Sequence, residues 1–398
     1  MAASSRTRCR ARWCCGRGGR SADGVDPRRP EASLRAPRSK MSAGAARADA
    51  DPLDLAIVGA GPCGLAAAVA AKERGLTHAV VDRGCITESL THYPYYMTFF
   101  STAERLEIGG VPFTIPEAKP TRQQALAYYR RVVGHHALNV RQYEEVTAIG
   151  RRAGGEFVLH TRIRAGREDR IRARAVVIAT GGFGKPNRLD LEDGQAHDRV
   201  IHYYKEPYPF FDQDVIVVGG GNSAVEAALE LYRNGVRVRM VHFLGVFDRG
   251  VKPWVRPDID NRIASGEIPM HWGSRVSRLE PGTATIVRDE SGAATGVPDH
   301  TDDATAQPHA SGTATEVPCD WVLAMTGWRP DRTLLHGLGV HTDPHTGIPD
   351  HDRATMETNV PGVYIAGVIA AGFNANKIFI ENGREHGDLI AAAVAGKG

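Results

Sequence analysis

The sequence is poor in the features that mark several large classes of protein. No run of apolar residues reaches the roughly 18 needed for a membrane-spanning helix, which excludes an integral membrane protein. Its six cysteines include no Cys-x-x-Cys pair and no metal-like cluster, so neither a disulfide-stapled scaffold nor a zinc domain is expected. We therefore predict no metal site, no membrane association and a reducing, cytoplasmic compartment.

The chain also lacks a uniform excess of charge. Its formal net charge is +3, but residues 1–50 alone hold 12 basic and four acidic side chains, a net charge of +8. The rest of the chain is therefore mildly acidic, at −5, and gives no reason to expect nucleic-acid binding.

Large apolar side chains are almost missing from residues 1–50, which therefore cannot offset the entropy of ordering. We predict that this segment is disordered. A transit peptide fits its Arg-rich composition weakly, and translation from Met41 is the alternative. Cys9, Cys14 and Cys15 lie in this segment and are assigned no chemistry.

The remaining composition is that of a soluble globular protein. A length of 398 residues suggests two or three domains. Hydrophobic residues make up 42% of the chain, enough for a sizeable core. The 44 glycines point to several tight turns where backbone approaches a ligand.

One glycine-rich turn follows the apolar strand expected at 54–58, precedes a helix at 65–74 and a strand at 78–81, and is followed by an acid. Backbone N–H groups of such a turn approach a pyrophosphate, and the acid accepts hydrogen bonds from a ribose. This pattern predicts a dinucleotide site, the alternative being a glycine-rich turn in an ordinary βαβ unit. The expected binding residues are Gly59, Gly61, Pro62, Cys63, Gly64 and Asp82.

The same pattern recurs after the strand expected at 214–218, before a helix at 225–233 and a strand at 236–243. The expected contacts here are Gly219, Gly221, Asn222, Ser223 and Ala224, with alanine at the third glycine position.

This second unit has no carboxylate at the position of the earlier acid. His242 ends the second strand, and Arg249 and Lys252 follow it. A carboxylate would repel a 2′-phosphate, so its absence and these cations favour NADPH over NADH, although both cations also fit a solvated loop. Two nicotinamides in one chain would be redundant, so we predict FAD in the first unit and NADPH in the second.

The spacing of the two units resembles the two-dinucleotide-binding-domain flavoproteins, such as thioredoxin reductase. Residues 179–182 (Ala-Thr-Gly-Gly) and 324–327 (Ala-Met-Thr-Gly) look like the turns of that family at the crossings between its domains. Residues 358–367 resemble its second FAD motif, but Val368 stands where the family has Asp. The resemblance implies FAD contacts at Val146, Thr180, Gly181, Gly367 and Val368, and an NADPH contact at Gly327.

More specific stretches resemble the YpdA family of bacillithiol-disulfide (bacilliredoxin) reductases. They are residues 61–65, 98–101, 108–113, 203–208, 366–372 and 379–383. The resemblance covers about residues 53–393. It implies FAD, NADPH and the reduction of a low-molecular-weight thiol disulfide, or of a small redox protein, by an enzyme that is commonly oligomeric.

The resemblance implies an α/β fold of two Rossmann-like domains, with the NADPH domain inserted in a split FAD domain. We predict FAD-domain parts at 51–205 and 330–398 and an NADPH domain at 206–329. A helix is expected at 121–138 and a β-meander beside the FAD sheet at 140–180. Residues 289–312 are expected to form a mobile hairpin tip.

The redox step has one candidate cysteine. Cys63, Cys85 and Cys319 of the expected folded part form neither Cys-x-x-Cys nor Cys-x₄-Cys. Cys63 begins the first Rossmann helix, whose dipole is expected to lower its thiol pKa. The resemblance singles out the same residue as redox-active, although a small side chain beside the pyrophosphate is the structural alternative. Cys85 and Cys319 are expected to be inert, buried thiols.

Other residues are assigned more loosely. The aromatic-rich segment 92–100 either walls the flavin or substrate pocket or belongs to the core. Asn374, Asn376 and Lys377 precede the last helix, whose N-terminus is expected near the flavin edge. There the helix dipole or Lys377 would stabilise the reduced flavin anion, the alternative being a solvated loop. His386 lies on that helix as a possible acid or a structural residue.

Two rival functions remain open. Residues 183–187 with His202 resemble the motif between the nucleotide sites of flavin monooxygenases, although His202 lies too far downstream. A flavin-bearing redox sensor without turnover is the non-enzymatic rival.

Overall fold

The computed structural model describes residues 51–194, 197–288 and 312–397. The expectations for residues 1–50, and for all of the hairpin tip except residue 312, lie outside this range. Within it, no helix combines the length and the apolar character needed to cross a membrane.

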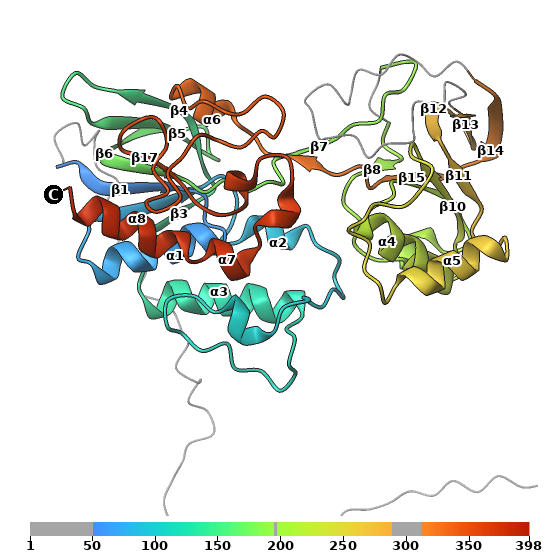
Figure 1. The fold of residues 1–398 in the computed structure, drawn as a ribbon, viewed down its shortest axis with the longest axis horizontal. Helices are drawn as coiled ribbons and strands as arrows, with labels where there is room; N and C mark the ends of the chain where they lie inside the picture. Colours follow the sequence, from blue (N-terminus) through green and yellow to red (C-terminus); the bar gives the residue numbers. More distant parts are fainter. Residues whose placement is uncertain (1–50, 195–196, 289–311, 398) are drawn as a thin grey trace, which may run out of the picture. The chain divides into compact units, whose positions relative to one another are not determined.

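A seven-stranded sheet forms the first half of the fold (Figure 1). Its strands run in the order β3-β2-β1-β6-β5-β4, and β17 also pairs with β6. The apolar run that ends at Val58 is buried at the centre because β2 and β6 pair with it in parallel on either side. The strands are β1 (Leu53–Val58), β2 (His78–Asp82), β3 (Val140–Gln142), β4 (Glu144–Arg151), β5 (Phe157–Ile163), β6 (Glu168–Ile178) and β17 (Val363–Ile365).

The long strand β6 joins two parts of this sheet. Its first half pairs with β5 in antiparallel fashion, up to Ala173 opposite Phe157. Its second half pairs with β17 in parallel, with Val176 opposite Val363. The prediction of a β-meander beside the FAD sheet was therefore wrong in one respect, because β4 and β5 are themselves strands of the seven-stranded sheet.

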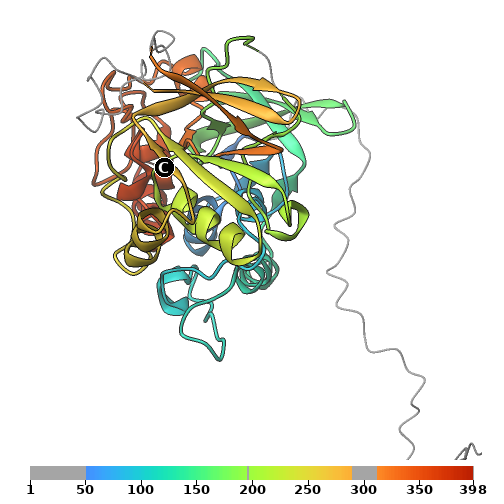
Figure 2. The ribbon, with the colours of Figure 1, turned by 90° about the vertical axis from the view of Figure 1, so that its right-hand side faces the viewer.

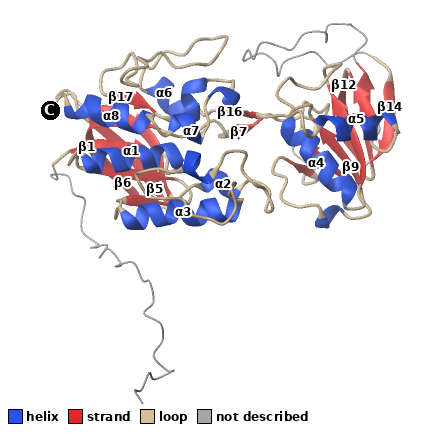
Figure 3. Ribbon diagram, turned by 60° about the horizontal axis from the view of Figure 1, so that its bottom comes forward, coloured by secondary structure: helices blue, strands red, loops and turns tan. Residues whose placement is uncertain are grey.

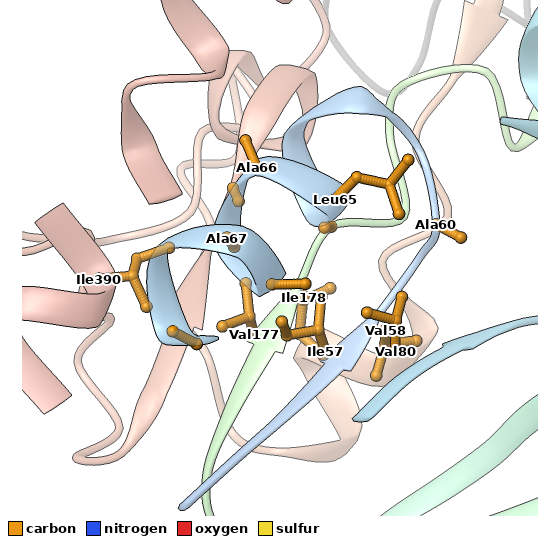
Figure 4. Close-up of a cluster of buried hydrophobic side chains, with 14 of the residues drawn as sticks. Ile57, Val58, Ala60, Leu65, Ala66, Ala67, Val80, Val177, Ile178 and Ile390 are labelled. Carbon is orange, nitrogen blue, oxygen red and sulfur yellow. The ribbon is translucent and has the colours of Figure 1, made fainter. Parts of the chain in front are cut away.

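Two helices far apart in the sequence lie side by side on this half (Figure 1). Helix α1 is rich in alanine, and Gly387 of α8 approaches its backbone so closely that an added Cβ would lie 2.7 Å from the nitrogen of Ala67. Figure 4 shows Ile390 of α8 beside Ala67 in the apolar cluster below α1. The helices are α1 (Pro62–Glu73), α2 (Glu88–Thr91), α3 (Arg122–His135), α6 (Thr333–Gly337), α7 (Ile380–Gly383) and α8 (His386–Ala395).

A second, five-stranded sheet has the order β11-β10-β9-β15-β8, and a three-stranded antiparallel sheet packs against it (Figure 2). Ile216 and Val241 of the larger sheet share an apolar cluster with Val276 and Ile286 of the smaller one. The elements are β8 (Val200–Ile201), β9 (Asp214–Val218), α4 (Asn222–Arg233), β10 (Arg237–His242), α5 (Arg256–Ala264), β11 (Met270–Trp272), β12 (Ser274–Glu280), β13 (Thr283–Arg288), β14 (Ala314–Pro318) and β15 (Trp321–Ala324).

The chain passes between the two halves through a pair of short strands (Figure 3). These are β7 (Lys185–Pro186) and β16 (Trp328–Arg329), and they pair with each other in antiparallel fashion. Strand β8 lies before residue 206 yet already belongs to the second sheet. The division into domains at 205 and 329 therefore stays a prediction.

Candidate functional site

The first glycine-rich turn is braced from below by a turn that follows β6. Gly59 has a positive φ of 114°, and an added Cβ would overlap the carbonyl of Ala179. A Cβ added to Gly64 would likewise overlap the carbonyl of Gly59. Helix α1 and strand β1 therefore meet here without side chains between them. At Gly61 an added Cβ would meet nothing within 4 Å, which leaves the front of the turn open to a ligand.

Asp82 holds this turn from the end of β2. Its carboxylate accepts hydrogen bonds from the N–H of Ala60 at 2.6 Å and of Gly84 at 2.8 Å. Burial raises the pKa of Asp82, and these two N–H groups oppose that rise. Asp82 therefore lies at the first glycine-rich turn, as expected. Its two hydrogen bonds fix the backbone of this turn, which would face a ribose.

The second glycine-rich turn repeats this construction. Gly219 has a φ of 140°, and an added Cβ would overlap the carbonyl of Met325, which belongs to the turn after β15. Gly327 in that turn also has a positive φ, of 87°. Asn187 fastens the turn, because its side-chain amide donates to the carbonyl of Thr326 at 2.9 Å.

Helices α1 and α4 begin directly after these turns, with Gly61 and Gly221 as their N-caps. Neither helix has a side-chain hydrogen bond at its N-cap. Cys63 and Gly64 in α1, and Asn222, Ser223 and Ala224 in α4, lie in the first turns as the sequence predicts. A pyrophosphate would supply the missing acceptors, so both sites fit a dinucleotide.

His242 occupies in the second unit the place of Asp82 in the first. It ends β10, its side chain is 2% exposed, and neither ring nitrogen has a hydrogen-bond partner among the described residues. A Cβ added to Gly220 would overlap its ring, whereas the equivalent residue of the first unit is Ala60. The imidazole thus lies directly beneath the second glycine-rich turn.

A carboxylate that no sequence pattern predicts also lies at this turn. Asp248 approaches from the loop after β10, with Oδ1 3.6 Å from Nε2 of His242, and its N–H donates to the carbonyl of Gly220. Lys252 pairs with Glu226 of α4, 3.2 Å away, and Arg249 is exposed. No sequence motif indicates Asp248, because its approach to the turn depends on the path of the loop after β10.

The expected low pKa of Cys63 was wrong. Burial raises the pKa of its thiol to about 12. The sulfur points into the protein, where Cβ atoms added to Gly367 and Gly383 would lie 2.8 and 2.9 Å from it. Loss of hydration around the sulfur thus opposes the helix dipole and favours the neutral thiol, although Cys63 as a whole is only half-buried.

The other two cysteines of the described ranges also have raised thiol pKa values. Burial raises the pKa of Cys319 to about 11, and its side chain is buried as expected. Cys85 is only half-buried, and its thiol donates to Oε2 of Glu88 at 2.8 Å. Burial and this carboxylate raise the pKa of Cys85 to about 12.

The second FAD motif ends beside Cys63. The N–H of Gly367 donates to Nδ1 of His386 at 3.1 Å, so this histidine supports the motif, and burial lowers its pKa. Val368 packs against Gly182 of the turn after β6. An apolar contact therefore stands where the family has a ribityl-binding carboxylate.

The remaining expected contacts lie around this half of the fold. Val146 is buried in β4, Thr180 is exposed, and Gly181 has a φ of 78°. Lys377 is exposed in a short 3-10 turn. Two helices, α7 and α8, stand where a single last helix was expected. The helix nearest to Lys377 in the sequence is α7, which has only four residues.

The aromatic-rich segment divides between core and surface. Phe99 is buried, whereas Tyr96 and Phe100 are 64% and 50% exposed. The Phe100 ring lies 6.3 Å from that of Trp254, which follows Lys252 in the loop after β10. No group of three or more metal-ligating side chains occurs in the described ranges.

Comparison with known proteins agrees with this geometry. The family model of the pyridine nucleotide-disulphide oxidoreductases matches residues 56–367. Bacilliredoxin reductase Bdr of Bacillus subtilis (strain 168) is 39% identical over 339 residues, which cover 85% of this chain and 96% of that protein.

Two solved structures are similar throughout. The bacillithiol disulfide reductase Bdr (YpdA) of Bacillus cereus is 39% identical, with a TM-score of 0.79 over 87% of this chain and all of that one. The Staphylococcus aureus enzyme is 37% identical, with a TM-score of 0.76 over 87% of this chain and 99% of that one. The protein is therefore an FAD- and NADPH-dependent oxidoreductase. It belongs to the YpdA family of disulfide reductases, within the pyridine nucleotide-disulphide oxidoreductases.

Proposed function

We propose that this protein reduces a low-molecular-weight thiol disulfide of the bacillithiol type with electrons from NADPH. The balanced reaction consumes one NADPH, one proton and one disulfide, and yields NADP⁺ and two thiols. The observation that carries this proposal is the pair of glycine-rich turns at the starts of α1 and α4, each braced by its own crossing turn at Ala179 and Met325. Bound FAD would accept a hydride from NADPH and pass two electrons to the disulfide.

Each coenzyme would be bound by its own group of residues. We propose that Gly59, Gly61 and the first turn of α1 hold the FAD pyrophosphate, with Asp82 fixing the turn behind it. The corresponding group around Gly219, Gly221 and α4 would hold NADPH. The remaining proposed contacts are Pro62, Val146, Thr180, Gly181, Gly367, Val368 and Lys377 for FAD, and Gly327, Arg249 and Lys252 for NADPH.

Within this proposal Cys63 is the candidate for a thiol step, because it alone of the three described cysteines touches the second FAD motif. Its pKa of about 12 means that it would have to lose its proton during turnover to attack a disulfide. Replacing Cys63 by Ala and assaying NADPH-driven disulfide reduction tests this step. Undiminished turnover would remove Cys63 from the mechanism.

A stopped-flow experiment tests the function as a whole. The yellow, FAD-loaded protein is mixed anaerobically with NADPH, and then with bacillithiol disulfide, glutathione disulfide or cystine. We expect bleaching of the flavin band by NADPH and fastest recovery with bacillithiol disulfide. A colourless preparation, or a flavin that NADPH does not bleach, would contradict the proposal.

Repeating the mixing in air-saturated buffer separates the rival activities. NADPH consumption with oxygen uptake and no need for a disulfide would indicate a monooxygenase. Bleaching without turnover by any acceptor would indicate a redox sensor.

The setting of the reaction is also proposed. A small-molecule disulfide, or a small redox protein that carries one, is the expected partner, in a homo-oligomer located in the cytoplasm. We propose that the FAD domain comprises 51–205 and 330–398, with the NADPH domain at 206–329 between them.

A further inference from the structure

The carboxyl-terminal edge of the second sheet carries aromatic rings where this type of fold binds an adenosine ribose. Phe243 directly follows β10, and Trp272, at the end of β11, lies in register with His242. The next residue, Gly273, turns the chain, and its N–H donates to the carbonyl of Leu244 at 3.1 Å. The start of β12 is thereby held against the loop that follows β10.

This turn delivers a cation to the same edge. Arg275 lies in β12, two residues after Gly273, with its guanidinium carbon 5.0 Å from the centroid of the Phe243 ring. Among the described residues no ion pair joins Arg275 to a carboxylate, whereas Arg278 of the same strand pairs with Glu192 and Glu280. Arg275 is half-buried, and its guanidinium is therefore held by a ring and not by an acid.

A 2′-phosphate bound at this edge of the sheet would need a cation of this kind as its partner. The carboxylate of Asp248 lies beside the turn at Gly221, and it would repel a 2′-phosphate brought to the end of β10. Lys252 is already paired with Glu226. A guanidinium matches a phosphate with two parallel hydrogen bonds, which makes it the stronger counter-charge.

We propose that Arg275, stacked on Phe243, binds the 2′-phosphate of NADPH and thereby sets the preference of this enzyme for NADPH over NADH. This assignment rests on the NADPH-dependent function proposed above. It places the selective charge on β12, about 30 residues beyond the end of β10, and not on the loop that carries Arg249 and Lys252.

Equilibrium binding tests the assignment without any disulfide. Isothermal titration of the full-length, FAD-loaded protein measures adenosine 2′,5′-bisphosphate, with 5′-AMP as the ligand that lacks the 2′-phosphate. For Arg275→Ala we expect the bisphosphate to bind about 10- to 100-fold more weakly, the loss typical of one charge-assisted contact, and 5′-AMP to bind as before. For Arg275→Lys we expect an intermediate affinity for the bisphosphate, because lysine keeps the positive charge but cannot donate two parallel hydrogen bonds.

Arg278→Ala is the matched control, since it removes an arginine of the same strand that pairs with surface acids. We expect it to bind both ligands like the unaltered protein. Equal weakening of both ligands in Arg275→Ala would make Arg275 structural and overturn the assignment. So would a selective loss in Arg249→Ala or Lys252→Ala with none in Arg275→Ala. Because no acceptor is present, a failure to reduce disulfides would leave this result untouched.

Discussion

At the scale of single residues, the two nucleotide units differ most at the end of their second strands. Asp82 accepts a hydrogen bond from the N–H of Ala60, whereas His242 fills the space beneath Gly220 without a hydrogen bond to any described residue. The smaller carboxylate leaves room for a methyl group in the turn above it, and the imidazole does not. Each turn residue is therefore matched to the side chain below it.

This match predicts a compensating pair of substitutions. Gly220→Ala forces its Cβ into the His242 ring, which overpacks a buried site and should lower the free energy of unfolding by about 1–3 kcal/mol. Adding His242→Asp recreates the first unit and should recover most of that loss. Chemical denaturation followed by circular dichroism measures both variants.

Gly245→Ala is the control for the compensating pair, since an added Cβ there meets nothing within 4 Å. It should leave the unfolding free energy within about 0.5 kcal/mol of the original. A Gly220→Ala protein as stable as the control would show that the ring moves aside freely.

The high pKa of Cys63 predicts slow alkylation of the folded protein. At pH 7 a thiol with a pKa of about 12 is deprotonated in only about one molecule in 10⁵, against a few per cent for a free cysteine. Labelling by iodoacetamide should therefore be about 1,000-fold slower than in the unfolded chain. It should also accelerate about tenfold per pH unit between pH 7 and 9, because the thiolate gains population as pH rises.

Peptide mapping by mass spectrometry assigns the label to Cys63 and separates it from Cys85 and Cys319. Rapid modification of Cys63 at pH 7 in the resting, FAD-loaded protein would show that the thiolate is stabilised after all.

At the scale of elements, the contact between α1 and α8 depends on small residues from both ends of the chain. Gly387 lets α8 approach the backbone of α1 at Ala66 and Ala67. Because α1 also begins at the first glycine-rich turn, which is proposed above to bind FAD, this contact helps to set the direction in which its first N–H groups point.

Gly387→Ala should separate these helices. The added Cβ would lie 2.7 Å from the nitrogen of Ala67, so we expect a loss of about 1–3 kcal/mol in unfolding free energy and weaker retention of FAD. Gly396→Ala, at the end of α8 with its nearest neighbour at 3.5 Å, is the control. Unchanged stability and flavin content in Gly387→Ala would contradict this account of the contact.

At the scale of the whole molecule, the chain leaves and re-enters the first half through β7 and β16, which pair with each other. Gly184 and Asp331 are therefore neighbours, with the Asp331 nitrogen 2.9 Å from a Cβ added to Gly184. The first sheet is complete without any strand from the segment between them.

This closeness predicts that the insertion can be removed. A chain in which residues 51–186 continue through two glycines into 328–398 should fold and bind FAD, because the two ends already meet. It should not be bleached by NADPH, since the second glycine-rich turn is gone. Absorbance spectra and stopped-flow mixing test both points, and a colourless, unfolded product would contradict the prediction.

Local sequence patterns predict much of this fold, and long-range contacts limit the rest. The turn at Gly59 and the apolar run before it were enough to place β1, α1 and β2 to within a few residues, because a glycine turn and a buried strand are both local signals. The burial of Cys63 depends on Gly367 and Gly383, some 300 residues away. No local pattern contains that information.

The second site shows the same limit. The positions of Gly219 and His242 followed from the repeat of the first pattern, and the structure has them at the expected turn and strand end. The return of Asp248 and the approach of Arg275 depend on how a loop and a separate small sheet pack. Such approaches are set by tertiary packing and carry no motif.

The two carbonyls that brace the glycine turns, those of Ala179 and Met325, lie only a few residues before β7 and β16. We therefore expect a twist of either connecting strand to shift the backbone beneath one of the two glycine-rich turns, each of which is proposed above to bind a coenzyme. The relative orientation of the two halves and the proposed binding of both coenzymes would thereby be coupled.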